Sequence, residues 1–167
     1  MATLLLMRHG KSDWGASHQG DHERPLNGRG VRSARIIGRL LAARGEVPDH
    51  VISSTAVRAR TSAELAKEAG GWECQISLDA DLYHSGPDGV IEAAAQAPQV
   101  GRLMLVGHQP TWSLLSRDLT GTWVDMKTAT VAVIEFDIAG WAGLGDARGA
   151  LSDVINPREH FGSEFDT

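Results

Sequence analysis

The chain has 167 residues, which is enough for one domain and leaves little room for a second. It carries 16 Lys and Arg against 21 Asp and Glu, and the net charge of −5 argues against a general nucleic-acid binder, which is normally basic. Cys74 is the single cysteine, so no intrachain disulfide can form, and no apolar run has the length of a membrane span. Residues 1–7 lack the charge order of a secretory signal. We therefore expect a cytoplasmic protein with neither a nucleic-acid nor a membrane partner.

Short apolar segments alternate with amphipathic ones along most of the chain. Strands are expected at 3–7, 50–53, 74–78, 102–106, 130–136 and 150–155. Helices are expected at 28–44, 56–69, 89–97 and 111–119. Asn27 is a suitable N-cap for the first helix, and Gly45 suits its C-terminal end.

This alternation predicts an α/β fold, a three-layer α/β/α sandwich with a mostly parallel central sheet. The last two strands are joined through a glycine-rich stretch, which suggests a hairpin-like return. We expect a single domain over residues 1–155 and a loose tail over residues 156–167.

Three of the expected strands are followed by polar residues. These are the sequences RHG at 8–10, SS at 53–54 and GHQP at 107–110. Arg58 comes soon after the second of them, at the start of a helix. Because ligands bind outside the carboxyl ends of parallel strands, we expect His9, His108 and at least one arginine to meet at one edge of the sheet.

Such a cluster suits phosphoryl transfer. Guanidinium groups bind phosphate oxygens through two parallel hydrogen bonds and stay charged at any working pH. A neutral imidazole can attack phosphorus and form a phosphohistidine intermediate. Neighbouring cations keep that imidazole deprotonated and stabilise charge in the transition state.

Four segments of the chain resemble the histidine phosphatase (phosphoglycerate mutase-like) superfamily, and more narrowly its small SixA-type phosphohistidine phosphatase branch. The segments are LLLMRHGKSDW at 4–14, RPLNGRG at 24–30, SSTAVRARTSAELA at 53–66 and LMLVGHQP at 103–110. They occur in the order and at the spacing of that family. The resemblance implies a phosphoglycerate mutase-like fold and a phosphatase that needs neither a metal nor another cofactor.

The resemblance also implies roles for individual residues. His9 matches the phosphorylated nucleophile, Arg8 and Arg58 match two phosphate-binding arginines, and His108 matches the second histidine of the pocket. Further candidate substrate-binding residues are Gly10, Ser12, Arg24, His84 and Gln109. Gly10 would permit a tight turn after the nucleophile.

Three departures from the mutase-like members bear on the substrate. Gly15 stands where those members have a phosphate-contacting asparagine, and His84 stands near the position of their glutamate proton donor. Asp79 and Asp81 are the nearby carboxylates, and neither is clearly placed to donate a proton. The chain also lacks the long insertion that covers small substrates in the mutases.

These absences favour protein phosphohistidine as the substrate, because an imidazole can be protonated before cleavage, whereas an alkoxide needs a positioned acid. Two alternatives stay open. One is a small-molecule phosphomonoesterase of the same superfamily, and the other is a module that binds phosphate or a phosphoprotein without turnover.

Several residues near these motifs have simpler interpretations. His18 and His22 are four residues apart, with Asp21 between them, and fit a solvated loop better than a metal pair. Arg60 fits an ordinary helix-face residue, and Trp112 fits core packing. Trp14 could form an apolar rim for a protein substrate.

Overall fold

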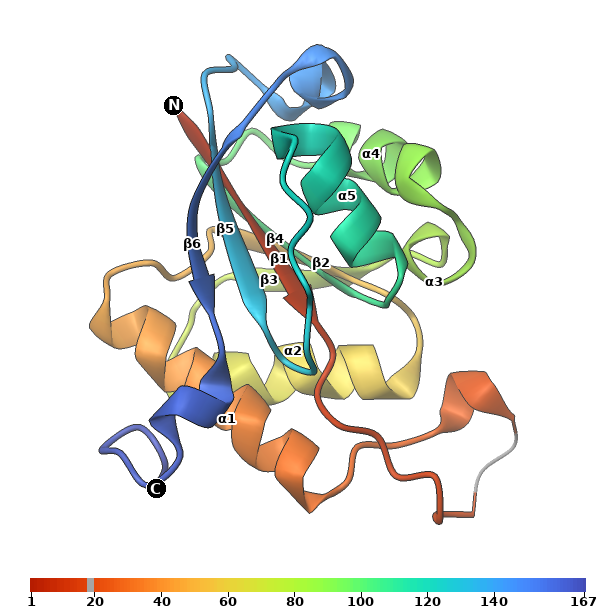
Figure 1. The fold of residues 1–167 in the computed structure, drawn as a ribbon, viewed down its shortest axis with the longest axis vertical. Coiled ribbons are helices and arrows are strands. Elements are labelled where there is room, and N and C mark those ends of the chain that lie inside the picture. The colour runs from red at the N-terminus through yellow and green to blue at the C-terminus, as the bar shows by residue number, and fades with distance from the viewer. Residues whose placement is uncertain (18–19) are drawn as a thin grey trace.

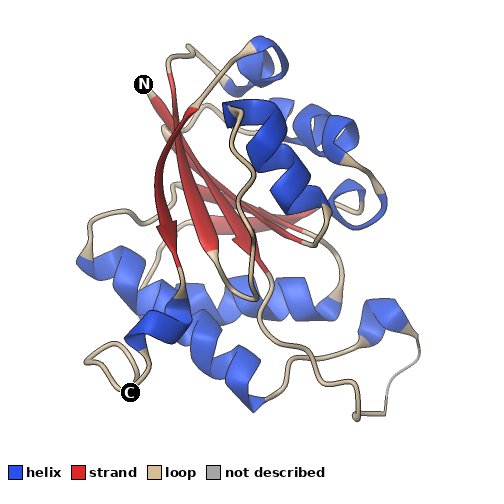
Figure 2. Cartoon of the chain, in the orientation of Figure 1, coloured by secondary structure: helices blue, strands red, loops and turns tan. Residues whose placement is uncertain are grey.

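The structure is a computed structural model that describes residues 1–17 and 20–167. The described residues form one six-stranded sheet at the centre of the fold (Figure 2). Its strands, in spatial order, are β3 (Gln75–Leu78), β2 (His50–Ser53), β4 (Arg102–Gly107), β1 (Ala2–Arg8), β5 (Val131–Phe136) and β6 (Ala150–Ile155). The first four are parallel to one another, and β5 is antiparallel to both of its neighbours. The mostly parallel sheet predicted from the sequence is confirmed.

Helices cover both faces of this sheet (Figure 1). One face carries α1 (Gly28–Ala43) and α2 (Val57–Gly70), and the other carries α3 (Asp81–His84), α4 (Pro87–Ala95) and α5 (Thr111–Thr120). Three 3-10 turns complete the described elements: η1 (Asp21–Glu23), η2 (Trp141–Asp146) and η3 (Pro157–His160). The expected α/β/α layering is therefore confirmed, with most boundaries shifted by one or two residues.

Two apolar cores explain why β1 is a continuous hydrophobic run. Leu4 and Leu6 are fully buried among residues of α4 and α5, whereas Leu5 and Met7 are fully buried among residues of α1 and α2. Successive side chains of a strand point to opposite faces, so a strand covered on both sides needs apolar residues at every position. β1 is thereby fixed at the centre of the molecule, and its carboxyl end is held in place.

The first helix begins and ends as its sequence predicts. Asn27 Oδ1 accepts a hydrogen bond from the Gly30 N–H at 2.9 Å, and Gly45 has a left-handed φ of 69° just after the helix. α1 lies close against the backbone of α2 at Gly38. A Cβ at this position would stand only 2.0 Å from the Ala66 carbonyl oxygen, so the close approach requires glycine. The two helices form a tight layer beneath the sheet.

The segment expected to be a loose tail is instead packed against α1. The Asp166 carboxylate pairs with Arg32, and Arg39 donates a hydrogen bond to the Phe165 carbonyl at 3.0 Å. The Phe165 side chain joins the apolar core on that face. These partners lie more than 120 residues away in the chain, so no local pattern indicates the contact. Within the described ranges no helix combines the length and the apolarity needed to cross a membrane.

Candidate active site

The three polar strand ends lie side by side, as predicted from the sequence. Arg8 of β1 is opposite Gly107 of β4, and the His9 N–H donates to the Gly107 carbonyl at 3.0 Å. On the other side of β4, the Ser54 N–H donates to the Val106 carbonyl at 2.9 Å. Hydrogen bonds that continue the sheet therefore bring the segments after β1, β2 and β4 to one edge.

His9 is buried, with 6% of its surface exposed, and its Nδ1 lies 2.6 Å from the Gly10 carbonyl oxygen. A carbonyl can only accept a hydrogen bond, so Nδ1 carries the proton and Nε2 keeps its lone pair. Burial lowers the pKa of His9 to about 3; the Gly10 hydrogen bond opposes the shift, while His108 and Arg58 add to it. The imidazole is therefore neutral near pH 7, and burial contributes more to this than the neighbouring cations.

His108 stands beside it, with the two ring centroids 5.1 Å apart. Its Nε2 lies 2.8 Å from the Ser54 hydroxyl oxygen. Its Nδ1 is buried and has no hydrogen-bond partner among the described residues. Burial, and then the charge of Arg58, lower the pKa of His108 to about 4.

Arg8 and Arg58, the two predicted phosphate-binding arginines, line the same cavity as the two histidines, and each has an N–H donor that no described residue accepts. Arg8 donates from Nη1 to the Met126 carbonyl at 3.0 Å, and Arg58 donates from Nη1 to the Asp21 carbonyl at 2.7 Å. The Nε of each arginine is buried without a partner in the described part of the chain. Because buried N–H groups are normally hydrogen-bonded, two such groups beside His108 Nδ1 fit the oxygens of an anion.

These residues belong to one cavity of about 530 Å³. Its further lining residues are Lys11, Ser12, Trp14, Asp21, Arg24, Tyr83, His84, Gln109 and Thr128. Ser12, Arg24, His84 and Gln109, the candidate substrate-binding residues other than Gly10, are thus among the residues that line this cavity. Asp79 and Asp81 do not line the cavity; the Asp79 carboxylate accepts from the Asp81 N–H at 2.9 Å.

Gly10 has a different role from the expected one. Its φ is outside the left-handed region, so no tight turn requires glycine there. A Cβ at this position would instead stand 2.7 Å from the Gly30 carbonyl oxygen, and the Gly10 N–H donates to Ser62 Oγ at 2.9 Å. The residue lets the loop after β1 approach the start of α1 and does not line the cavity.

Other predicted residues act on neighbours within the pocket wall. Ser12 Oγ accepts from Arg24 Nε at 3.0 Å and so orients that guanidinium. The Gln109 amide accepts a hydrogen bond from the Ser113 N–H and donates one to the Ser113 hydroxyl. These two hydrogen bonds attach Gln109 to the first turn of α5. Both side chains support the shape of the pocket.

The lining residues that sequence reasoning missed include Asp21 and Tyr83. The Asp21 carboxylate accepts hydrogen bonds from Arg24, Arg58 and the Tyr83 hydroxyl. Burial works against the charge of Asp21, but the hydrogen bonds from Tyr83 and Arg58 outweigh it and hold the pKa of this carboxyl well below its usual range. The only sequence signal is the spacing of three residues between Asp21 and Arg24, which a single 3-10 turn brings together.

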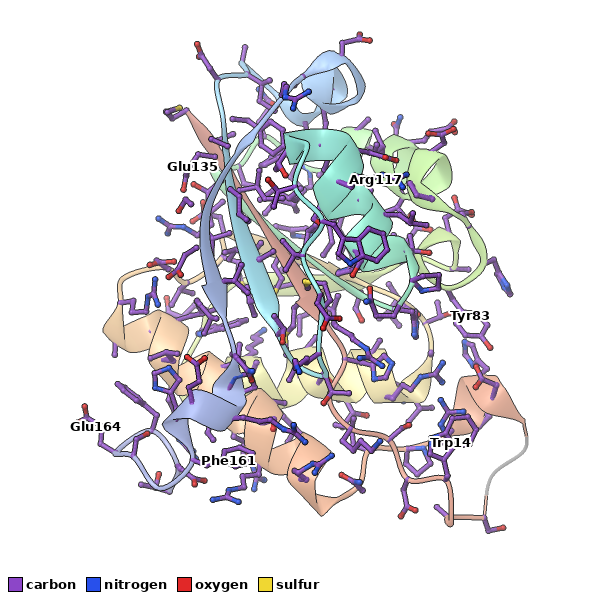
Figure 3. All side chains as sticks on the ribbon, in the orientation of Figure 1. Trp14, Tyr83, Arg117, Glu135, Phe161 and Glu164 are labelled. Carbon is purple, nitrogen blue, oxygen red and sulfur yellow. The ribbon has the colours of Figure 1, made fainter. Side chains whose placement is uncertain are left out.

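The structure also shows the surroundings of His22, Trp112 and Trp14. His18 lies outside the described residues, and the two ring nitrogens of His22 are hydrogen-bonded to Glu23 and Thr55. Trp112 is fully buried and packs in the core, as expected. Trp14 is 70% exposed and lies on the same side of the molecule as Tyr83, at the right of the view in Figure 3.

The chain is similar to several known proteins. Residues 4–84 match the model of the histidine phosphatase superfamily (branch 1). An uncharacterized protein of Mycobacterium leprae is 34% identical over 145 residues, which are 84% of this chain and 88% of that protein.

Two solved structures have the same fold over nearly their whole length. A protein of Nakamurella multipartitia, provisionally named phosphohistidine phosphatase SixA, is 31% identical with a TM-score of 0.79, covering 93% of this chain and 96% of the other. A protein of Agrobacterium tumefaciens with the same provisional name is 28% identical with a TM-score of 0.80, covering 93% and 98%. With its pocket, its motifs and these relatives taken together, the chain belongs to the histidine phosphatase superfamily.

Proposed function

We propose that this chain is a phosphatase that hydrolyses protein phosphohistidine through a phosphohistidine intermediate on His9. The observation that carries the proposal is a buried His9 that lines one cavity with Arg8, Arg58 and His108, each of which has a buried nitrogen atom without a partner among the described residues. A free imidazole lone pair next to unpaired donors is what phosphoryl transfer to a histidine requires.

In the first step His9 Nε2 attacks phosphorus in line with the bond to the leaving group. Arg8 and Arg58 bind the phosphoryl oxygens, and their fixed charges stabilise the transition state without reorganisation. For His108 Nδ1 to donate to an oxygen, the Ser54 hydroxyl must donate to Nε2, and the 2.8 Å contact between Nε2 and that hydroxyl allows it.

In the second step water attacks phospho-His9 on the face that the leaving group has vacated. The N–P bond breaks, its electron pair returns to Nε2, and inorganic phosphate leaves. The same arginines stabilise both transition states, because each has the same geometry around phosphorus.

The pocket supports a phosphorylated side chain on another protein as the substrate. Trp14 is 70% exposed beside the cavity, and Arg24 lies 3.5 Å from its ring centroid, so the rim presents a wide, fixed apolar surface. The two relatives provisionally named SixA are named for phosphohistidine phosphatase activity, which is consistent with this choice.

One observation favours a second candidate, a small-molecule phosphomonoesterase. The cavity contains a carboxylate, Asp21, and ester hydrolysis needs an acid near the leaving oxygen. However, the depressed pKa of Asp21 keeps it ionised, and an ionised carboxylate has no proton to donate. We therefore retain phosphohistidine as the primary proposal.

The test compares a histidine-phosphorylated protein with p-nitrophenyl phosphate and a sugar phosphate as substrates. We expect kcat/KM to be highest on the phosphorylated protein. His9→Ala should lower turnover by at least about a thousandfold and remove any phosphoenzyme trapped by rapid quenching, because it deletes the nucleophile. His160→Ala, in the C-terminal segment, is the matched control and should retain activity.

Each other outcome identifies a different error. Turnover retained by His9→Ala would reject the nucleophile, and a sugar phosphate turned over fastest would establish the esterase. Tight phosphate binding with no turnover of any substrate would indicate a binding module.

A further inference from the structure

Asp21 is the one carboxylate that lines the cavity among the described residues, and it lies within a group of cations. Its Oδ2 accepts from Arg58 Nη2 at 2.9 Å and from the Tyr83 hydroxyl at 2.8 Å, and its Oδ1 accepts from Arg24. A carboxylate has about four acceptor positions. Since Oδ1 takes a single hydrogen bond from the described residues, it has room for another donor.

The Asp21 carboxylate lies nearer the solvent than His9 does. His9 is 6% exposed and forms the floor, whereas the Asp21 side chain is 50% exposed. In-line attack from the floor sends the leaving group toward solvent. The Tyr83 hydroxyl donates to Asp21, and the Tyr83 ring centroid is 5.5 Å from that of His108, so Tyr83 connects the carboxylate to the second histidine of the pocket.

A fixed negative charge at this position has opposite effects on two kinds of substrate. It repels a phosphate dianion, and it repels the oxyanion that develops when an ester bond breaks. It attracts a ring that carries a proton, and with it a positive charge, while the ring is still bonded to phosphorus. The imidazole of phosphohistidine is such a group, because its second ring nitrogen can bear an N–H.

We propose that Asp21 is a specificity-determining residue, whose carboxylate accepts a hydrogen bond from the protonated leaving imidazole of phosphohistidine and disfavours phosphate esters. This inference rests on the proposed function and assigns its substrate preference to one side chain. Arg24, Arg58 and Tyr83 keep the carboxylate in place.

The bonds balance without any further reactant. His9 Nε2 forms a bond to phosphorus as the P–N bond of the substrate breaks, and the electron pair of that bond stays on the leaving nitrogen. The ring departs as neutral imidazole with its proton still on the second nitrogen. Asp21 accepts a hydrogen bond from that N–H throughout and never has to donate a proton.

The first test is Asp21→Asn assayed on a histidine-phosphorylated peptide and on p-nitrophenyl phosphate, whose leaving group needs no proton. We expect kcat/KM on the peptide to fall about tenfold or more, the effect of losing one charge-assisted hydrogen bond, with no fall on the ester. Glu23→Gln is the matched control. It removes the same charge from the same turn, its side chain is 51% exposed, and it does not line the cavity.

An equal change on both substrates, or a larger loss on the ester, would overturn the proposal, because Asp21 would then only orient the arginines or act as an acid. Wild-type protein that cleaves the ester but not the peptide would refute the proposed function itself. The two failures are therefore distinguishable.

The second test needs no turnover and remains informative if Asp21→Asn is inactive. Inorganic phosphate is titrated into both proteins at pH 8 by calorimetry. Loss of a like charge should tighten phosphate binding by about five- to tenfold in Asp21→Asn. Weaker binding would show that the carboxylate supports the anion site, and this result would also overturn the proposal.

Discussion

At the scale of single residues, the site depends on two histidines that burial keeps neutral. The pKa of His9 falls to about 3 and that of His108 to about 4, from an ordinary value of 6.5. The sequence indicates which histidines these are, because each directly follows an apolar strand. It does not indicate how deeply they are buried, since that depends on α1, α2 and α5 packing around the sheet edge.

These lowered pKa values make stability depend on pH. Between about pH 6.5 and pH 3 the unfolded chain takes up a proton at His9 that the folded chain excludes. The unfolded state binds more protons there, so the free energy of unfolding rises with pH. The stabilisation is complete above the unfolded pKa and is lost as the pH falls toward the folded one.

We therefore predict that His9→Gln is less sensitive to acid than the wild type. From pH 7 to pH 5 the wild type should lose about 2 kcal/mol more of its free energy of unfolding than the variant, measured by urea denaturation. His160→Gln controls for the removal of a histidine as such. Equal losses in wild type and His9→Gln would mean that burial does not control the protonation of His9.

At the scale of elements, the positions of strands and long helices could be read from the sequence, and the short turns could not. β2 and β6 begin and end as expected, and α1 starts at the residue after its predicted N-cap. The turn η1 and the helix α3 have three and four residues, too few to show a periodic pattern. Asp21 and Tyr83 lie on these two elements, which explains why both residues were missed.

The contact between α1 and α2 depends on glycine at Gly38. Because the atom that a Cβ would meet is the Ala66 backbone carbonyl, 2.0 Å away, no side chain can move to make room. Gly38→Ala must push the helices apart, and we expect it to lower the free energy of unfolding by about 1–3 kcal/mol. Gly28 lies on the same helix with nothing within 4 Å of its Cβ position, so Gly28→Ala serves as the control.

For the control the expected sign is opposite. Gly28→Ala should leave stability unchanged or raise it by up to about 1 kcal/mol, since alanine has less conformational freedom to lose in a helix. Urea denaturation of both variants gives the comparison. A Gly38→Ala protein as stable as Gly28→Ala would show that the helices can separate at little cost.

At the scale of the whole molecule, the topology of the sheet determines which motifs meet. β1 is central and β4 lies between β1 and β2, so segments that are about 45 and 100 residues apart in the chain share one edge. The rule that ligands bind at the carboxyl ends of parallel strands was therefore sufficient to predict His9, Arg58 and His108 together. It could not predict Asp21, because η1 reaches the pocket through side-chain contacts and not through strand order.

The C-terminal segment provides the last prediction, because its packing against α1 is a contact that only the folded chain makes. In Figure 1 it lies at the lower left, beside α1, and η1 lies at the lower right. Phe165 is partly buried in the core beside α1, so Phe165→Ala should lower the free energy of unfolding by about 1–3 kcal/mol. Val154→Ala, at a β6 position that is 41% exposed, should change it far less. Because no residue of the segment lines the cavity, kcat/KM of Phe165→Ala at 25 °C should stay within about twofold of wild type, since both cores remain folded. Unchanged stability would mean that residues 156–167 are not held against α1 in solution.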